Sequence, residues 1–243
     1  MKCSCRKGQR LSSIESREIE RLITFVKENP EAFRLILEVV NSFRPTDSDR
    51  VKAERVFLAV KDILELGLLS YSKAEKVLTI LKEFFVGGCD KRRGDFLEIL
   101  ISKLGPFTFR GRYRRSNQCK VFKGKRKLSE KEIDVAFSGR GVLELHECKV
   151  NMVRQWRDPL NKRGKRGSKL NFLNSLPREC EGEKRVVPCC SGLDGELGAE
   201  YVRLVFRFYG YRNIKVIGRE EIFERLIERL KWSSGTGERP GSS

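Results

Sequence analysis

Two acidic residues and a lysine lie close together in the middle of the chain. Asp134 belongs to the segment EIDVAF, and Glu147 and Lys149 belong to VLELHECKV, which follows after four residues. Neighbouring carboxylates repel each other unless a cation neutralises them, and Mg²⁺ or Mn²⁺ takes hard oxygen ligands. A water bound to such an ion can attack a phosphorus atom, and a nearby ammonium can stabilise the charge that develops there. The three residues therefore predict metal-dependent hydrolysis of a phosphodiester.

A β-hairpin is the element that would bring these side chains together. Residues 132–137 and 142–150 are rich in strand-forming residues, and Ser-Gly-Arg-Gly at 138–141 is typical of a hairpin turn. Side chains alternate between the two faces of a strand, so Glu147 and Lys149 share a face. An even-length turn places Asp134 on this face too, whereas an odd-length turn would not.

The register of the hairpin decides which residues are opposite each other. If the first and last residues of the turn pair, Asp134 faces Leu145, and Glu147 lies diagonally from Asp134 on the same face, with Cβ atoms about 7–8 Å apart. Glu132 would then face Glu147 and becomes a rival carboxylate. His146, the only histidine, falls on the opposite face and is expected to be structural.

Two basic stretches, at 110–127 and 154–169, flank the hairpin in sequence. Such arms suit a site that must bind phosphates around an acidic metal centre. Trp156, in the second stretch, is either a base-stacking residue or an ordinary surface residue, and glycines at 164 and 167 suggest a loop that orders on binding. The side chains expected to contact nucleic acid are Arg112, Arg114, Arg115, Lys123, Lys125, Arg126, Arg163, Lys165, Arg166 and Lys169.

The overall charge of the chain points to the same partner. The formal net charge is +18, and a protein this basic usually meets a polyanion, with nucleic acid the main candidate and DNA expected rather than RNA. A ribosome-like role or binding to a membrane surface is the alternative explanation of the charge. No apolar run is long enough for a membrane span, and the N-terminus lacks a secretory signal, so we expect a cytoplasmic protein.

The eight cysteines do not have the spacing of a zinc knuckle or an iron–sulfur motif. Cys3 and Cys5 are one residue apart, and Cys189 and Cys190 are adjacent. For a cytoplasmic chain we expect reduced thiols, and a structural metal or cluster is the lesser alternative.

The hydrophobic pattern divides the chain into a helical part and an α/β part. Apolar residues recur at helical spacing between residues 11 and 86, and from residue 92 predicted helices and strands follow in the order α-β-β-β-α-β-α-β-α. We therefore expect a helical N-terminal domain over 1–88, an α/β domain with a mixed sheet over 89–231, and a disordered Gly/Ser-rich tail over 232–243. The helical domain is expected to be a scaffold or a mount for partners.

The residues of the hairpin resemble the motif of the PD-(D/E)XK nuclease superfamily. Asp134 at one strand, followed by Glu147-Cys148-Lys149 at the next, is similar to its acidic residue and Glu-X-Lys pattern, although Ile133 replaces the usual proline. The resemblance covers about residues 92–218. It implies a restriction-endonuclease-like αβββαβ core, Asp134 and Glu147 as metal ligands, and Lys149 as the catalytic lysine. It also implies an acidic residue on the first core helix, for which Glu98 is the natural match and Asp95 the second choice, and a polar residue on the later helix, such as Lys169 or Asn171.

The sequence is compatible with three functions. The first is a Mg²⁺- or Mn²⁺-dependent endonuclease that cuts DNA by metal-activated attack of water. The second is a non-catalytic nucleic-acid-binding or regulatory protein with the same fold. The third is a ligand-regulated RNA nuclease in which the helical domain acts as a sensor. A homodimer would suit an enzyme that cuts both strands of a duplex, but the sequence contains nothing that requires one.

Overall fold

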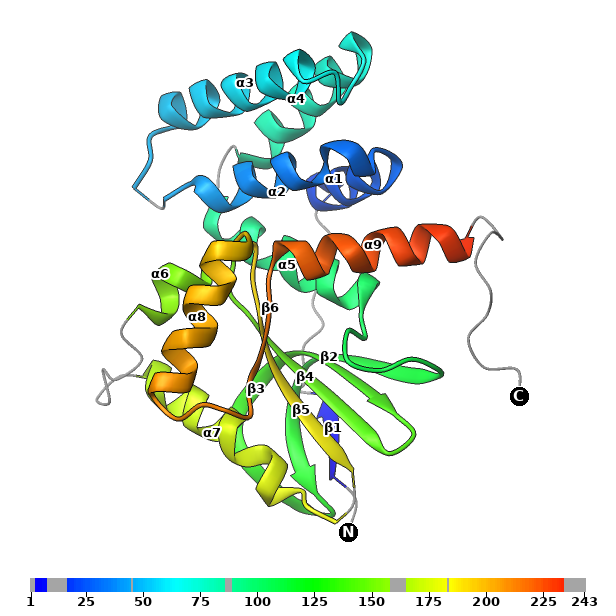
Figure 1. Cartoon of the computed structure of the whole chain (residues 1–243), viewed down its shortest axis with the longest axis vertical. Coiled ribbons are helices and arrows are strands. Elements are labelled where there is room, and N and C mark those ends of the chain that lie inside the picture. The colour runs from blue at the N-terminus through cyan, green and yellow to red at the C-terminus, as the bar shows by residue number, and fades with distance from the viewer. Residues whose placement is uncertain are drawn as a thin grey trace.

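The structure, a computed structural model, is an α/β protein with a helical layer beside a mixed sheet (Figure 1). It describes residues 3–7, 17–44, 46–85, 89–157, 165–182 and 184–233. Across these ranges, none of the helices combines the length and the apolar character needed to cross a bilayer.

The sheet contains six strands in the order β1-β2-β3-β4-β5-β6. The first four pair antiparallel, whereas β4, β5 and β6 are parallel. Their bounds are β1 Cys3–Lys7, β2 Tyr113–Lys123, β3 Arg126–Gly139, β4 Val142–Cys148, β5 Arg185–Ser191 and β6 Lys215–Ile217. Every residue of β4 is buried, as expected for a strand that lies between two neighbours and is covered on both faces.

Helices cover both faces of the sheet. The core on one face joins Val135 and Phe137 of β3 to α5 (Cys89–Leu104), α9 (Arg219–Ser233) and the N-terminal helices. The core on the other face joins Leu143 and Leu145 of β4 to α6 (Met152–Trp156), α7 (Lys165–Glu179) and α8 (Glu196–Phe208). The face that carries these two leucines is therefore covered by helices.

The order α5-β2-β3-β4-α7-β5 reproduces the expected αβββαβ core, with the short helix α6 inserted after β4. The prediction of an α/β fold of this class with a mixed sheet is confirmed. The expected N-terminal helices are also present, as α1 (Arg17–Glu28), a 3₁₀ turn (Pro30–Ala32), α2 (Phe33–Ser42), α3 (Asp49–Glu65) and α4 (Tyr71–Phe85). Ser48 caps α3, because its hydroxyl accepts a hydrogen bond from the backbone N–H of Val51 at 3.3 Å.

The N-terminal helices share a hydrophobic core with the rest of the protein. Residues of α1, α2 and α4 belong to the same buried cluster as those of α5 and α9. The strand β1 also comes from the first part of the chain, yet it pairs with β2 at the edge of the sheet. The division into domains at residue 88 stays a prediction.

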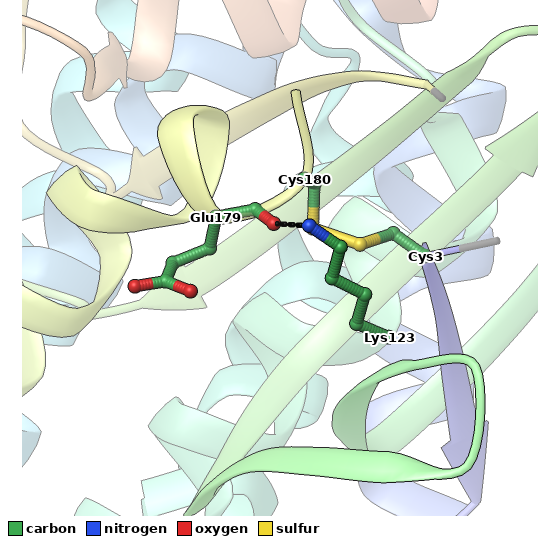
Figure 2. The surroundings of a disulfide bond; sticks show 4 residues. All are labelled: Cys3, Lys123, Glu179 and Cys180. Atoms are coloured by element: carbon green, nitrogen blue, oxygen red, sulfur yellow. Dashed lines mark hydrogen bonds between the residues drawn. A yellow bond between two sulfur atoms is a disulfide. The ribbon is translucent and has the colours of Figure 1, made fainter. Parts of the chain in front are cut away.

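Two disulfides attach β1 to the rest of the protein. Cys3 bonds to Cys180 at the end of α7, and Cys5 bonds to Cys119 of β2. The expectation of reduced thiols is wrong for these four cysteines, because β1 lies beside partners that are 177 and 114 residues away in sequence. In Figure 2, the first disulfide lies next to Lys123, whose Nζ atom donates a hydrogen bond to the main-chain oxygen of Glu179 at 2.7 Å.

Candidate active site

The hairpin that carries the acidic residues has an even-length turn, but its register differs from the expected one. Ser138 pairs with Leu143 and Val135 with His146, so the pairing is shifted by two residues. Gly141 adopts a φ of 72°, which supports a turn centred on Arg140 and Gly141. A shift of two residues keeps Asp134, Glu147 and Lys149 on the face predicted for them.

The shifted register changes which carboxylates meet. Continued by one position beyond Val135, it places Asp134 across from Glu147 rather than across from Leu145. Glu132 does not face Glu147. Its side chain is exposed, and in the sheet its backbone lies opposite Lys120 of β2. Glu132 is therefore excluded as an alternative carboxylate opposite Glu147. Asp134 lies directly across from Glu147 and not diagonally from it, as the predicted register had placed it.

The strands separate at the site. Regular pairing of β3 with β4 ends at Val135 and His146, and the backbone N–H of Cys148 instead donates to Oδ2 of Asp134 at 2.7 Å. One residue later, the N–H of Lys149 donates to the main-chain oxygen of Ser191 at 2.8 Å, so β4 continues along β5. Asp134 thus connects the end of β4 to β3 at the point where the two strands diverge.

Two lysines surround the paired carboxylates. The Nζ atom of Lys149 lies 2.7 Å from Oε1 of Glu147 and 3.8 Å from Oδ2 of Asp134. Lys169, from α7, forms an ion pair with Oε2 of Glu147, and its Nζ atom is 3.9 Å from Oδ1 of Asp134. The Glu147 side chain is 3% exposed and that of Lys149 is 30% exposed, so the carboxylates lie at the bottom of the site and Lys149 lies closer to solvent.

The fourth predicted member, Glu98 of α5, lies within the electrostatic field of this group. Burial and the carboxylates of Asp134 and Asp95 raise the pKa of Glu98 to about 7. Its Oε2 atom is buried and has no hydrogen-bond partner among the described residues. A buried carboxylate oxygen that has no hydrogen-bond partner and lies near other carboxylates is costly in the protein interior, and a bound cation would relieve this cost.

The charges in the site depend on one another. Burial and the Glu147 carboxylate raise the pKa of Asp134. Burial alone would favour neutral Lys149, yet the carboxylates of Glu147 and Asp134 hold the pKa of its ammonium above the ordinary value. Lys149 is therefore a cation at neutral pH, as the sequence led us to expect.

The residue types fit a hard divalent cation, although their present arrangement is that of an ion-pair cluster. Asp134, Glu147 and Glu98 would supply carboxylate oxygens, the ligands that Mg²⁺ and Mn²⁺ prefer, and the unpartnered oxygen of Glu98 supports this fit. In the part of the chain that the structure describes, no three His, Cys, Asp or Glu side chains are close enough to hold an ion as they lie. The ammonium groups of Lys149 and Lys169 currently neutralise the carboxylates.

Of the basic residues predicted to contact nucleic acid whose side chains the structure describes, Lys169 is the one that lies at the carboxylates. Arg126 is eight residues from Asp134 along β3, about 26 Å at 3.3 Å per residue, and Lys125 lies in the turn before it. Arg112 and Arg114 are exposed near the other end of the β2–β3 pair, and Arg115 donates to the main-chain oxygen of Ser102 at 3.1 Å. Lys123 lies beside the end of α7, at the main-chain oxygen of Glu179. Arg163 and Gly164 lie outside the described residues, as do the side chains of Lys165 and Arg166. Gly167 lies in α7, so the expectation of a loop that orders on binding is wrong at this position.

The surroundings of His146 in β4 and Trp156 in α6 show what each ring does in the structure. His146 is buried and bonds to Glu144 at 2.7 Å and to Ser191 at 2.8 Å, which confirms its structural role. Trp156 is 1% exposed, and its Nε1 atom donates to the sulfur of Cys190 at 3.0 Å. Both interpretations of Trp156, as a base-stacking residue and as an ordinary surface residue, are therefore wrong, because its ring fills the core between α6 and α8. Asn171 is exposed on α7.

A groove that no pattern in the sequence indicated begins at Lys149. It has a volume of about 1070 Å³ and is lined by residues from the end of α2, the segment that follows it, α6 and α8. Exposed cations of this groove include Arg44, Arg154 and Arg157. The latter two belong to the second basic stretch, but Arg44 comes from the helical region, and no local pattern in the sequence connects it to the site.

Comparison with known proteins adds two structures of similar fold. No protein-family model matches the chain, and no curated protein matches its sequence. Protein VC1899 from Vibrio cholerae is 17% identical, with a TM-score of 0.43 over 98% of this chain and 60% of that one. Can2 from Sulfobacillus thermosulfidooxidans, solved in complex with cyclic tetra-adenylate, is 11% identical, with a TM-score of 0.36 over 94% of this chain and 57% of that one. The chain thus spans less than two thirds of either protein, and likenesses this distant carry no argument about its activity.

Proposed function

We propose that the protein is a metal-dependent nuclease that hydrolyses phosphodiester bonds, with DNA as its expected substrate. The observation that carries the proposal is the convergence of four charged side chains. Asp134 comes from β3, Glu147 from β4, Lys149 from the residue that follows β4, and Lys169 from α7. Acidic groups that bind a cation, beside ammonium groups that bind phosphate oxygens, are the components that phosphodiester hydrolysis needs.

Each side chain has a task in this proposal. Asp134, Glu147 and Glu98 would hold a Mg²⁺ or Mn²⁺ ion, which when bound acidifies water and polarises the phosphate. Lys149 is charged and lies nearer to solvent than Glu147, so its ammonium can contact a phosphate oxygen and stabilise the charge that develops there. Lys169 approaches the same carboxylates from α7 and would orient Glu147 or contact the phosphate.

The charge of the whole chain supports nucleic acid as the substrate. A formal net charge of +18 would attract a polyanion and promote its binding through release of counterions. Endonucleolytic cutting of DNA and formation of a homodimer both belong to this proposal as expectations.

A second function is favoured by the ion pairs themselves. Glu147 forms ion pairs with both Lys149 and Lys169, and a carboxylate that is already neutralised has less need of a metal ion. A non-catalytic nucleic-acid-binding protein would keep the basic surfaces and use the ion-pair cluster only to stabilise the fold.

A cleavage assay separates the two functions. Plasmid DNA, single-stranded and duplex DNA oligonucleotides and RNA are incubated with Mg²⁺, Mn²⁺ or EDTA, using the wild type and Lys149→Ala. Lys73→Ala is the matched control, because Lys73 is exposed on α4 and takes no part in the site. The nuclease predicts cleavage that needs the metal ion and Lys149 but not Lys73. Absence of metal-dependent cleavage of every substrate would favour the binding protein.

A further inference from the structure

We propose that the groove between the end of α2 and α6 binds a single-stranded stretch of nucleic acid and leads it to Lys149. The inference rests on the proposed function in one respect, since it takes Lys149 as the point where the phosphodiester is cut. Figure 1 shows α2 above α6, with α8 running beside α6. The groove lined by these elements has a volume of about 1070 Å³, at the upper limit of pockets that bind small molecules.

Most of the charged side chains that line the groove are cationic. Among the described residues that line it, five are cations, namely Arg44, Arg93, Lys149, Arg154 and Arg157, and one, Glu38, is acidic. The carboxylate of Glu38 already forms an ion pair with Arg219 at 3.1 Å. A groove with this excess of positive charge suits the phosphates of a polynucleotide.

Internal hydrogen bonds hold the two walls of the groove in place. Arg93 donates to the main-chain oxygens of Val40, Asn41 and Phe43, which stabilises the end of α2. On the other wall, Asp194 accepts a hydrogen bond from the N–H of Met152 at 2.5 Å and so anchors α6. These hydrogen bonds therefore fix the backbone near Arg44 and Arg154, whose guanidinium groups are exposed.

An aromatic ring in the groove favours a single strand over a duplex. Tyr201 of α8 lines the groove and is 42% exposed. A basic groove with an exposed aromatic side chain is the usual arrangement for single strands, because unpaired bases can stack on the ring. The Glu147 carboxylate, with a side chain only 3% exposed, is recessed, and a flexible strand can bend towards it more easily than a stiff duplex.

Binding is tested by fluorescence anisotropy in EDTA, so that affinity is measured without cleavage. The probes are labelled (dT)₁₂, (rU)₁₂ and a blunt DNA duplex, and they also show whether DNA or RNA is preferred. We expect the wild type to bind a single strand more tightly than the duplex. Arg154→Ala/Arg157→Ala should weaken single-strand binding about tenfold or more and reduce the salt slope by about 1.4, the loss of two phosphate contacts. Tyr201→Ala should weaken it about fivefold or more, whereas Tyr201→Phe keeps the ring and binds as the wild type does.

The matched control is Lys73→Ala/Arg178→Ala, which removes two exposed cations outside the groove and should change single-strand binding less than twofold, as expected for general charge alone. The inference is overturned if the duplex binds more tightly, if nothing binds, or if the groove variants bind as well as the control. Cleavage by the wild type with unaltered binding in the groove variants would remove this inference and leave the nuclease intact. Single-strand binding in the groove without any cleavage would support this inference and contradict the proposed nuclease.

Discussion

The carboxylate of Asp134 accepts a hydrogen bond from the backbone N–H of Cys148, 2.7 Å away, at the position where β3 and β4 separate. Cys148 stands between Glu147 and Lys149, so this one contact sets the position of both neighbours relative to Asp134. Asp134 therefore has two tasks, one electrostatic and one structural, and substitutions can separate them.

Asp134→Asn should lower the nuclease rate by at least about 100-fold, because it removes a charge from the cation site. The amide oxygen can still accept from Cys148, so the melting temperature should change little. Asp134→Ala removes the acceptor as well and should cost a further 1–3 kcal/mol, approximately the penalty for a buried N–H without a partner. Cleavage rates and thermal melts of both variants test this. Equal activity in Asp134→Asn and wild type would remove Asp134 from the site.

The two lysines are expected to differ in importance. Lys149→Ala should reduce cleavage by about 100-fold or more, because its ammonium stabilises charge on the phosphate. Lys169→Ala should cause a smaller loss, about tenfold, which corresponds to 1.4 kcal/mol of transition-state stabilisation. Rates measured at saturating substrate compare the two directly. A larger effect of Lys169→Ala would reverse the roles that we propose.

Divalent cations should stabilise the folded protein if the carboxylates bind them. At a Mn²⁺ or Mg²⁺ concentration about ten times the Kd, the free energy of unfolding should rise by about 1.4 kcal/mol. Glu147→Gln should abolish this increase, whereas Glu132→Gln, an exposed position on β3 away from the site, should retain it. Thermal melts with increasing metal and after EDTA provide the measurement. A metal-induced shift that is the same in both variants would contradict binding at this site.

The buried carboxylate of Glu144 should make the free energy of unfolding depend on pH in the acidic range. Burial disfavours its charge, yet hydrogen bonds from His146, Thr108 and the backbone N–H of Phe107 lower its pKa to about 2. A carboxylate whose pKa is lower in the folded state contributes stability above its ordinary pKa of 4.5, and this is lost as the pH falls from 4.5 towards 2. Glu144→Gln should cost about 2–3 kcal/mol at pH 7 and should flatten this acid dependence. Urea unfolding between pH 3 and 7 tests both statements, and an unchanged acid dependence in the variant would refute them.

The disulfides of β1 should contribute to stability under oxidising conditions. Breaking either bond frees a loop of more than one hundred residues, and loss of a disulfide of this kind costs about 2–4 kcal/mol. Dithiothreitol should therefore lower the melting temperature of the wild type. The double variant Cys3→Ser/Cys5→Ser should melt at the lower temperature with or without reductant. If the double variant melts at the same temperature as the untreated wild type, the bonds do not contribute to stability.

The sequence alone determined those features that follow from local periodicity. The period-two pattern of β3 and β4 placed Asp134, Glu147 and Lys149 on one face, and no shift by an even number of residues can change that. The helical spacing before residue 86 and the order of elements after residue 92 were readable for the same reason.

Only the tertiary structure decided which distant residues meet. It moved the hairpin register by two, excluded Glu132, brought Lys169 of α7 to Glu147, and joined Cys3 to Cys180. It also placed Arg44 of the helical region across a groove from Arg154. These contacts depend on how helices pack on the two faces of the sheet, which sums many weak side-chain interactions over the whole core, and no short stretch of sequence contains that sum.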